Sequence, residues 1–348
     1  MSKTFDVAIV GATGLVGEAL VSFLVERHFP VGHFFPLASV RTAGKKVGLG
    51  GKYHTVKDVA DFDFSQVDVA VFCANDETSA EYVPCATAAG CMVIDTSAQF
   101  VDDDDVPLVI PEVNPQTIAD YIQRKEIYKE QRNIIVSPDS ATIQMLVALK
   151  PVYDAVGIER INVVSYQAVT ASGKSGMDEL ASQTIALLNM QDAKRKMFPQ
   201  QIAFNILPQV TVAEENGYLS CEMKILRATQ KILADDDILI NPTTAQAPVF
   251  FGHSQAVHVE TGAKLGADEA RDLLRRAPGV MLLDDGEPGN SPTAVTHAAG
   301  EDAVFVGRIR EDISHPCGLS LWVVADNVRK GAALNCVQIL ELLVKEGL

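Results

Sequence analysis

A short polar stretch at residues 137–145, Ser-Pro-Asp-Ser-Ala-Thr-Ile-Gln-Met, has the composition of a turn that carries a nucleophile. It follows the apolar segment Ile134–Val136 and leads into an apolar helix predicted over residues 143–153. Ser140 at this strand-to-helix turn would lie beside the backbone N–H groups that open the helix, and these can stabilise an oxyanion. The chemistry would be attack on a carbonyl carbon. The alternative is that Asp139 or Ser140 is an ordinary N-cap.

A histidine in the second half of the chain is the next candidate. The segment Pro-Val-Phe-Phe-Gly-His-Ser-Gln-Ala-Val at residues 248–257 predicts an aromatic strand that carries His253. A histidine can transfer protons near neutral pH. Taken alone, a single histidine after an aromatic strand is more often structural. His258, further along the same strand, is predicted to pack or to face solvent.

Glycines at three-residue spacing follow the first predicted strand, Phe5–Val10. Gly11, Gly14 and Gly17 permit a tight turn, close approach of a pyrophosphate, and close packing of the helix predicted over residues 18–26. Because a strand precedes the glycines and a helix follows them, we predict a dinucleotide-binding turn. The alternative is a plain strand-to-helix turn.

The turn after the second predicted strand, residues 34–38, indicates which dinucleotide binds. A carboxylate here would hold a ribose 2′-OH and favour NAD. The chain instead offers Ser39, Arg41, Thr42 and Lys45, whose hydroxyls and cations suit a 2′-phosphate. We therefore predict NADP as the preferred cofactor, with a solvated basic turn as the alternative.

Residues 142–151, Thr-Ile-Gln-Met-Leu-Val-Ala-Leu-Lys-Pro, resemble the catalytic segment of the aspartate-semialdehyde dehydrogenase family. In that family the turn reads Asn-Pro-Asn-Cys-Ser-Thr-Ile-Gln-Met, and Ser140 occupies the position of its nucleophilic cysteine. The Gly-His-Ser-Gln-Ala-Val context of His253 and the C-terminal run Asp-Asn-Val-Arg-Lys-Gly-Ala-Ala-Leu-Asn also match. The resemblance covers the chain end to end, and the chain looks like a Usg-type paralogue of the family.

The resemblance implies NADPH-dependent reduction of β-aspartyl phosphate to an aldehyde, in which a thiolate attacks, phosphate leaves, hydride reduces the thioester and a histidine moves protons. A serine hydroxyl is far less acidic than a thiol, so Ser140 would need His253 and a third, orienting group. Asp139 is poorly placed for that role because it adjoins Ser140 on the turn. We expect a nucleotide-binding or oligomer-forming paralogue in which the family reaction is absent or strongly impaired. The alternatives are the family reaction at a reduced or altered rate, and an oxidoreductase for a less anionic carbonyl substrate.

The resemblance also implies which positions form the site. Phe100 and Gln246 stand where the family has arginines that bind substrate, and Asp139 stands where it has a neutral amide. Lys224 aligns with a family lysine, whereas the family glutamate three residues earlier is Cys221 here. Losing two charge-assisted hydrogen bonds would weaken substrate binding on the order of 100-fold or more. The implied catalytic residues are Ser140, His253 and Gln167. The implied cofactor contacts are Gly11, Thr13, Gly14, Leu15, Val16, Ser39, Arg41, Thr42, Gly173 and Asn335.

One departure from the family bears on cofactor affinity. The resemblance places two glycines near the cofactor phosphates, where this chain has Asn75, Asp76 and Glu77. Two carboxylates that faced a pyrophosphate would weaken binding by repulsion. They could equally point into solvent, and the sequence leaves both possibilities open.

Bulk properties exclude several classes of partner. A net charge of −16 argues against nucleic acid and anionic membranes as partners. The six cysteines show no CxxC pair and no metal spacing, so no metal site is predicted. The chain shows no signal sequence and no apolar run of membrane-spanning length, which predicts a cytoplasmic protein.

The order of predicted elements defines the fold class. Alternating strands and helices in the N-terminal part predict a Rossmann-like, doubly wound parallel sheet. Longer strands and helices follow, and the family resemblance implies an α+β catalytic and dimerisation domain with a large mixed sheet. We expect an α/β protein whose NAD(P)-binding domain is residues 1–134 plus 326–348, and whose catalytic domain is residues 135–325. The implied assembly is a homodimer.

Overall fold

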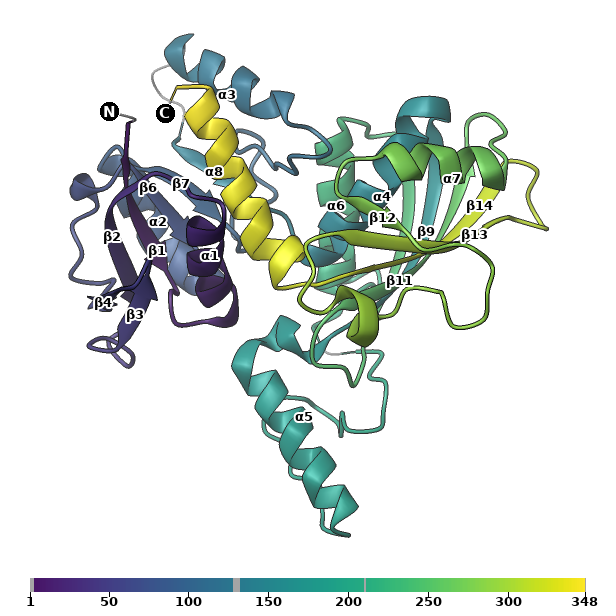
Figure 1. Ribbon diagram of the computed structural model, residues 1–348, viewed down its shortest axis with the longest axis horizontal. Coiled ribbons are helices and arrows are strands. Elements are labelled where there is room, and N and C mark those ends of the chain that lie inside the picture. Colours follow the sequence, from purple (N-terminus) through teal and green to yellow (C-terminus); the bar gives the residue numbers. More distant parts are fainter. Residues whose placement is uncertain (1–2, 128–131, 210, 348) are drawn as a thin grey trace. The chain divides into compact units, whose positions relative to one another are not determined.

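The computed structural model describes residues 3–127, 132–209 and 211–347. The chain divides into two compact units, drawn with the element labels in Figure 1. Unit 1 comprises Met1–Asp139 and Ala332–Leu348, and unit 2 comprises Ser140–Gly331. The expected domain boundaries, at 134/135 and 325/326, lie five and six residues before the two points where the chain passes from one unit to the other.

Unit 1 is built on a six-stranded sheet with the order β5-β2-β1-β6-β7-β8, in which every pairing is parallel. Its inner strands are almost wholly apolar because a parallel sheet is covered on both faces. The strands are β1 (Phe5–Val10), β2 (Val31–Ala38), β5 (Lys57–Asp58), β6 (Val69–Phe72), β7 (Met92–Asp95) and β8 (Ile134–Val136). A separate hairpin joins β3 (Lys46–Leu49) to β4 (Lys52–Thr55).

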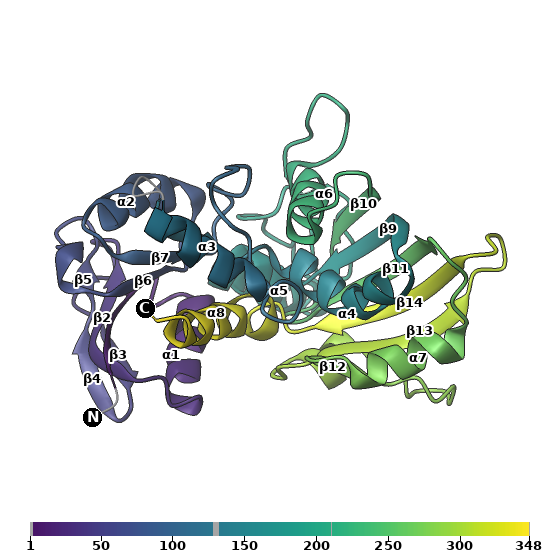
Figure 2. The same cartoon turned by 90° about the horizontal axis from the view of Figure 1, so that it is seen from above.

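Helices cover both faces of the unit 1 sheet. Figure 2 shows α2 (Asp76–Ala88) on the side opposite α1 (Leu15–Glu26) and α8 (Asn335–Lys345). The apolar faces of α1 and α8 share one core cluster with residues of β1, β6 and β7, and α3 (Gln116–Ile127) adds to the same cluster. This arrangement confirms the predicted Rossmann-like parallel sheet.

Unit 2 contains a second six-stranded sheet with the order β10-β9-β11-β14-β13-β12. β9 runs parallel to β10 and β12 parallel to β13, while the other pairings are antiparallel. This confirms the predicted mixed sheet. The strands are β9 (Ile158–Gln167), β10 (Leu239–Gln246), β11 (His253–Thr261), β12 (Val280–Leu282), β13 (Val304–Glu311) and β14 (Gly318–Ala325).

The helix α4 (Ser140–Val156) packs on the unit 2 sheet together with α6 (Ser220–Leu233) and α7 (Ala267–Arg276). Ten residues of α4 are buried, in agreement with the apolar sequence of the segment that starts at Ser140. The helix α5 (Gly173–Leu188) extends away from this sheet in Figure 1. It is fixed at its base by a small apolar cluster that includes Val169, Leu180 and Phe198.

Several element boundaries differ from those predicted. α4 begins at Ser140 and not at residue 143, so Ser140 belongs to the helix. The charged segment 123–127 is helical as the end of α3, and residues 128–131 lie outside the described part of the chain. A π-helical turn over Arg329–Leu334 precedes α8. None of the helices in the described ranges has the length and apolar character needed to cross a bilayer.

Candidate active site

Three side chains meet at one edge of the unit 2 sheet. β9 and β10 run parallel and end in register at Gln167 and Gln246. β11 runs antiparallel to β9 and begins at His253, one residue before Ser254 pairs with Tyr166. The topology therefore brings together two of the predicted catalytic residues and one predicted substrate position.

Ser140 is brought to the same edge by contacts of the first turn of α4. Gln255 of β11 donates from Nε2 to the carbonyl oxygen of Ala141 at 3.0 Å. Gly331 packs directly on Ser140, because a Cβ at residue 331 would lie only 2.4 Å from the Ser140 Cβ. Ser140 thus sits at the N-terminus of a buried helix, where the helix dipole favours negative charge.

His253 is almost fully buried, with 1% of its surface exposed. The backbone N–H of Ala168 donates to its Nδ1 at 3.0 Å. An N–H can only donate, so Nδ1 must be unprotonated and the neutral ring carries its proton on Nε2. Burial lowers the pKa of His253 from 6.5 to about 3, because the charged ring would lose its hydration. At neutral pH His253 is therefore an uncharged donor through Nε2.

Asn327 holds the two segments that form this hydrogen bond. Its Oδ1 accepts from the Gly252 N–H at 3.0 Å, and its Nδ2 donates to the Thr170 hydroxyl at 3.0 Å. Gly252 immediately precedes His253, and Thr170 lies two residues after Ala168. The tautomer of His253 is therefore set by a buried framework and does not depend on a single contact.

This geometry limits what the site can do chemically. A histidine that removes a proton from serine needs an unprotonated Nε2 and a donor at Nδ1, usually held by a carboxylate. His253 has the opposite arrangement, because a backbone donor occupies Nδ1. His253 can donate a hydrogen bond to a carbonyl or oxyanion, but in this tautomer it cannot activate Ser140.

The predicted substrate positions in unit 2 are largely engaged with the protein. Gln246 is 2% exposed and donates from Nε2 to the carbonyl oxygen of Gln167 at 2.8 Å. The Glu222 carboxylate accepts from the N–H groups of Leu219 and Thr244, both at 2.7 Å, so it anchors α6 to β10. Lys224 lies half-buried on α6.

Cys221 is the unit 2 thiol nearest in sequence to these positions. Its Sγ lies 3.1 Å from the Thr244 hydroxyl and 3.4 Å from that of Thr211. These partners are on β10 and on the loop before α6. The thiol is thus held by hydroxyl groups, and its contacts give it no role as a substitute for the missing cysteine at Ser140.

The remaining predicted substrate positions belong to unit 1. Phe100 is 8% exposed on the segment after β7, and Asp139 is exposed at the end of the unit. Gly173, a predicted cofactor contact, lies in unit 2 and opens α5 with a positive φ of 67°. The predicted site residues are therefore divided between the two units.

A pocket of about 620 Å³ lies at the carboxyl ends of β1 and β2 in unit 1. Six of the predicted cofactor residues line it: Gly11, Thr13, Gly14, Ser39, Arg41 and Thr42. Leu15 and Val16 open α1 directly behind this lining. The carboxyl ends of parallel strands are where doubly wound sheets bind nucleotides.

The glycines of this pocket are required by close backbone contacts. Gly11 has a φ of 85°, and a Cβ there would lie 2.2 Å from the carbonyl oxygen of Cys73. A Cβ on Gly17 would lie 2.2 Å from the carbonyl oxygen of Gly11. The open turn at the N-terminus of α1 therefore fits a dinucleotide pyrophosphate, which the helix N–H groups would hold.

Two family models match the chain. A model described as "Semialdehyde dehydrogenase, NAD binding domain" matches residues 6–121, and one described as "Semialdehyde dehydrogenase, dimerisation domain" matches residues 149–330. The aspartate-semialdehyde dehydrogenase of Shewanella violacea is 51% identical over 346 residues, which are 99% of each chain. The chain belongs to the aspartate-semialdehyde dehydrogenase family.

Structural comparison agrees with this assignment. The crystal structure titled as aspartate semialdehyde dehydrogenase II complexed with ASA from Vibrio cholerae is 52% identical, covers 100% of both chains and has a TM-score of 0.95. A probable aspartate-semialdehyde dehydrogenase from Pseudomonas aeruginosa is 36% identical, covers 99% of this chain and 100% of its own, and has a TM-score of 0.91. The semialdehyde dehydrogenase fold of this chain is thus shared over its whole length.

In this member of the aspartate-semialdehyde dehydrogenase family, Asn75, Asp76 and Glu77 lie at the start of α2. Asn75 is the N-cap, and its Oδ1 accepts from the Thr78 N–H at 3.2 Å. The Asp76 carboxylate accepts from the Ala98 N–H at 2.9 Å. Asn75 lines the nucleotide pocket, whereas Asp76 and Glu77 are not among its lining residues. The two acidic residues therefore serve the N-terminus of α2, where negative charge is favourable.

Sequence reasoning missed the contribution of α2 to the pocket. The pocket is also lined by three residues on adjacent turns of α2, Thr78, Glu81 and Tyr82, and by Asp58 at the end of β5. The Asn-x-x-Thr capping pattern was the available signal for where this helix starts.

Asn335, the last predicted cofactor contact, is buried in unit 1. Its Nδ2 donates to Ser137 Oγ at 2.9 Å and to the carbonyl oxygen of Val109 at 3.0 Å. Its Oδ1 has no partner among the described residues. Asn335 is therefore an internal amide with one unsatisfied acceptor, and its contacts are with the protein.

Proposed function

We propose that this chain is a nucleotide-binding, dimeric paralogue of Usg type, in which the phosphorylating semialdehyde dehydrogenase reaction is absent or strongly impaired. The observation that carries the proposal is the serine at the nucleophile position, and the hydrogen bond from the Ala168 N–H to His253 Nδ1 supports it. A thiol can reach its reactive anion with modest help, whereas an alcohol cannot. Ser140 cannot obtain that help from His253, because the ring carries its proton on Nε2 and its Nδ1 is occupied by the Ala168 N–H.

The substrate side supports the same conclusion. The relatives are named for aspartate semialdehyde, which carries a carboxylate. In this chain Gln246 is buried against Gln167, and Asp139 adds a negative charge to the turn before α4. Lys224 remains as a cation that could meet an anion. Weak substrate binding and a poor nucleophile reduce the rate together.

The nucleotide site supports retained binding of NADP in preference to NAD. Ser39, Arg41 and Thr42 line the pocket beyond β2, where the 2′-phosphate of NADP would be recognised. The bound nicotinamide supplies hydride-transfer chemistry. Asp76 and Glu77 do not line the pocket, so the carboxylates that could weaken binding are those of Asp58 and Glu81.

Self-association is expected to use unit 2, which matches the family's dimerisation domain. Large apolar side chains are exposed on α5 and the segments around it, and such patches mark protein interfaces. They are Ile185, Leu188, Met190, Met197, Phe204 and Ile206. We expect Leu188→Glu to shift the wild-type dimer toward monomer in light scattering coupled to size-exclusion chromatography, while the exposed control Val295→Glu leaves the dimer intact. A wild type that is monomeric at micromolar concentration contradicts this expectation.

The decisive experiment compares wild type with Ser140→Cys in phosphate-dependent reduction of NADP by aspartate semialdehyde. We expect NADP binding by calorimetry in both proteins, negligible turnover by wild type, and turnover at least about 100-fold higher in the variant. Ser140→Ala is the matched control and should behave like wild type. Robust wild-type turnover that Ser140→Ala abolishes would sink the proposal.

A second function is favoured by one feature of the site. His253 keeps an Nε2–H that can polarise a carbonyl, and Phe100 and Gln246 lower the positive charge of the substrate positions. The alternative is an active oxidoreductase, either aspartate-semialdehyde dehydrogenase itself or an enzyme for a less anionic aldehyde. Reduction of neutral aldehydes by NADPH that survives Ser140→Ala and is lost in His253→Gln would establish the second form of this alternative.

A further inference from the structure

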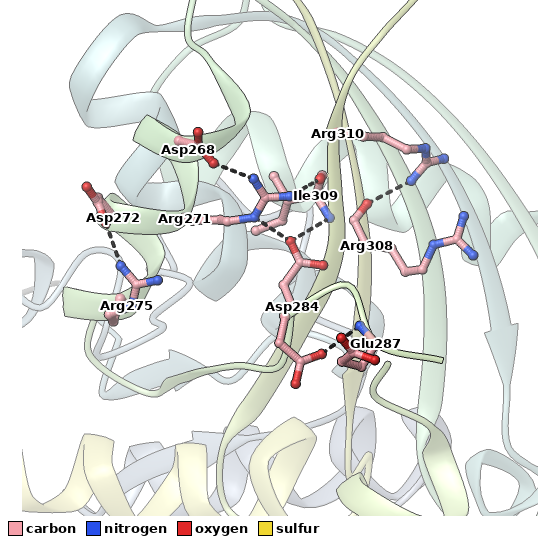
Figure 3. Close-up of polar contacts among 10 residues, drawn as sticks. Asp268, Arg271, Asp272, Arg275, Asp284, Glu287, Arg308, Ile309 and Arg310 are labelled. Carbon is pink, nitrogen blue, oxygen red and sulfur yellow. Dashed lines mark hydrogen bonds and ion pairs between the residues drawn. The ribbon is translucent and has the colours of Figure 1, made fainter. Parts of the chain in front are cut away.

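A separate pocket of about 450 Å³ lies in unit 2, between β13, α7 and the loop after β12. It contains none of the residues discussed for the reaction or the cofactor. Figure 3 shows its charged side chains, which come from the three elements and gather around the loop. They are Arg271, Asp284, Asp285, Glu287, Arg308 and Arg310.

Arg271 and Asp284 form the floor and are fully engaged with each other and the backbone. Arg271 Nε lies 2.7 Å from Asp284 Oδ2, and its Nη2 donates to the carbonyl oxygen of Ile309 at 2.7 Å. Gly307 lets the loop approach β13, because a Cβ there would lie 2.3 Å from the carbonyl oxygen of Leu283. The pocket is therefore a built part of the fold.

Arg308 and Arg310 are exposed on the wall and lack carboxylate partners. The Arg308 side chain has no hydrogen bond or ion pair within the described ranges, and Arg310 donates from Nη1 only to the carbonyl oxygen of Arg308, at 2.8 Å. Free guanidinium groups are unexpected in a chain with 45 acidic and 29 basic residues. Two neighbouring cations thus stand ready for an anionic ligand group.

The backbone at Arg308 supports a ligand role. Its φ of 54° is rare for a residue with a side chain, and it coincides with a β-bulge between Gly307 and Arg310. Bulges re-aim side chains and are frequent beside binding sites. A positive φ strains a residue that has a side chain, and glycine would adopt the same φ without this strain. Such strain tends to persist at positions where the side chain serves a function.

The loop after β12 supplies two further carboxylates to the lining of the pocket, those of Asp285 and Glu287. Hydrogen bonds from the Glu287 N–H and the Asn290 side chain lower the pKa of Asp285, so this carboxylate stays ionised. The Glu287 carboxylate itself has no hydrogen bond or ion pair with any described residue. A plain anion such as phosphate would be attracted by Arg308 and Arg310 but repelled by these two carboxylates.

We propose that this pocket binds a zwitterion of the amino-acid type. Its carboxylate would be held by the guanidinium groups of Arg308 and Arg310, and its ammonium group by Glu287 and Asp285. A ligand with both charges satisfies both the guanidinium groups and the carboxylates, whereas a simple anion or a simple amine satisfies one set and is repelled by the other. The proposal does not depend on the reaction at Ser140.

The test is calorimetric titration of the full-length protein with a panel of proteinogenic L-amino acids, and with acetate, phosphate and ethylammonium as single-charge probes. We expect at least one amino acid to bind and the single-charge probes not to bind. Arg308→Gln and Glu287→Gln should each weaken the amino acid at least about 10-fold. Arg275→Gln, which removes a cation that pairs with Asp272 on α7, should bind like wild type.

Arg308→Gly separates binding from folding. Glycine accepts the positive φ, so we expect this variant to melt at or above the wild-type temperature while it loses the amino acid as Arg308→Gln does. Three outcomes overturn the proposal: no amino acid binds wild type, acetate or phosphate binds as well as an amino acid, or the binding persists in Arg308→Gly.

Discussion

The nucleotide pocket of unit 1 and the His253 end of the unit 2 sheet belong to one family fold, but they differ in which atoms each offers to a ligand. In unit 1, six predicted residues line one pocket, and the glycine turn is held by backbone contacts. In unit 2 the strands and the helix have the arrangement of the family fold. The side chains that they carry are Ser140 and a histidine whose proton is on Nε2, so that this nitrogen is a donor. The family fold is kept in both units, and the pocket of unit 1 is shaped by backbone, whereas the candidate site of unit 2 depends on the side chains of Ser140 and His253.

The difference follows from the kind of group that each site uses. A pyrophosphate is bound mainly by backbone N–H groups and a helix terminus, which many sequences can provide. Acyl transfer depends on single atoms with defined proton positions, so one side chain can remove it. A shared fold therefore predicts nucleotide binding more safely than it predicts a reaction.

The largest expected effect is in unit 1. In Gly11→Ala the new Cβ would lie 2.2 Å from the Cys73 carbonyl oxygen, and we expect loss of NADP binding and a free energy of unfolding lower by at least about 3 kcal/mol. Gly90→Ala is the matched control, because Gly90 has a φ of 87° with nothing within 4 Å. It should cost about 1–2 kcal/mol and keep NADP binding. Equal behaviour of the two variants would show that backbone contacts do not define the pocket.

An intermediate effect concerns cofactor choice. We expect Arg41→Gln to weaken NADP binding by about 10- to 100-fold, since a charge-assisted hydrogen bond to phosphate contributes about 1.5–3 kcal/mol. NAD, which lacks the 2′-phosphate, should bind with unchanged affinity. Lys45→Gln tests a neighbouring cation that does not line the pocket and should leave both affinities unchanged. Parallel losses for NADP and NAD in Arg41→Gln would contradict a role in 2′-phosphate recognition.

A pH-dependent effect tests the proton position in unit 2. The pKa of His253 is about 3 in the folded state and 6.5 in the unfolded state, so only the unfolded state takes up this proton between those values. The stability that neutral His253 provides is complete above pH 6.5 and is lost as the pH falls toward 3, by about 1.4 kcal/mol per pH unit. Urea unfolding of wild type and His253→Gln should show this difference in slope. Parallel pH profiles, or an NMR spectrum with the proton on Nδ1, would break the contrast between the two units.

The sequence predicted some elements closely because their patterns are unambiguous. The strand at Phe5–Val10 is wholly buried except at Asp6 and has the predicted bounds. β10 and β12 were missed: β10 alternates burial and exposure through polar residues, and β12 has only three residues.

The candidate site was predictable in its members but not in its proton positions. Ser140, His253 and the glycine turn could be located from local motifs. The partner of His253 Nδ1 is the N–H of Ala168, 85 residues away, and no sequence pattern specifies which backbone group meets a ring nitrogen. The role of Asp76 could not be predicted for the same reason, because its carboxylate accepts a hydrogen bond from the N–H of Ala98, which is distant in sequence.

The division of unit 1 into two chain segments has a consequence for biosynthesis. Residues 140–331 form a continuous stretch, so this half has all of its core as soon as it leaves the ribosome. The N-terminal half emerges earlier but lacks Val337, Ile339, Leu340 and Leu343 of α8, which are fully buried in its core. The first segment to be translated is therefore the last to complete its core. Premature termination near the C-terminus would leave this segment with an exposed apolar face, to which chaperones bind.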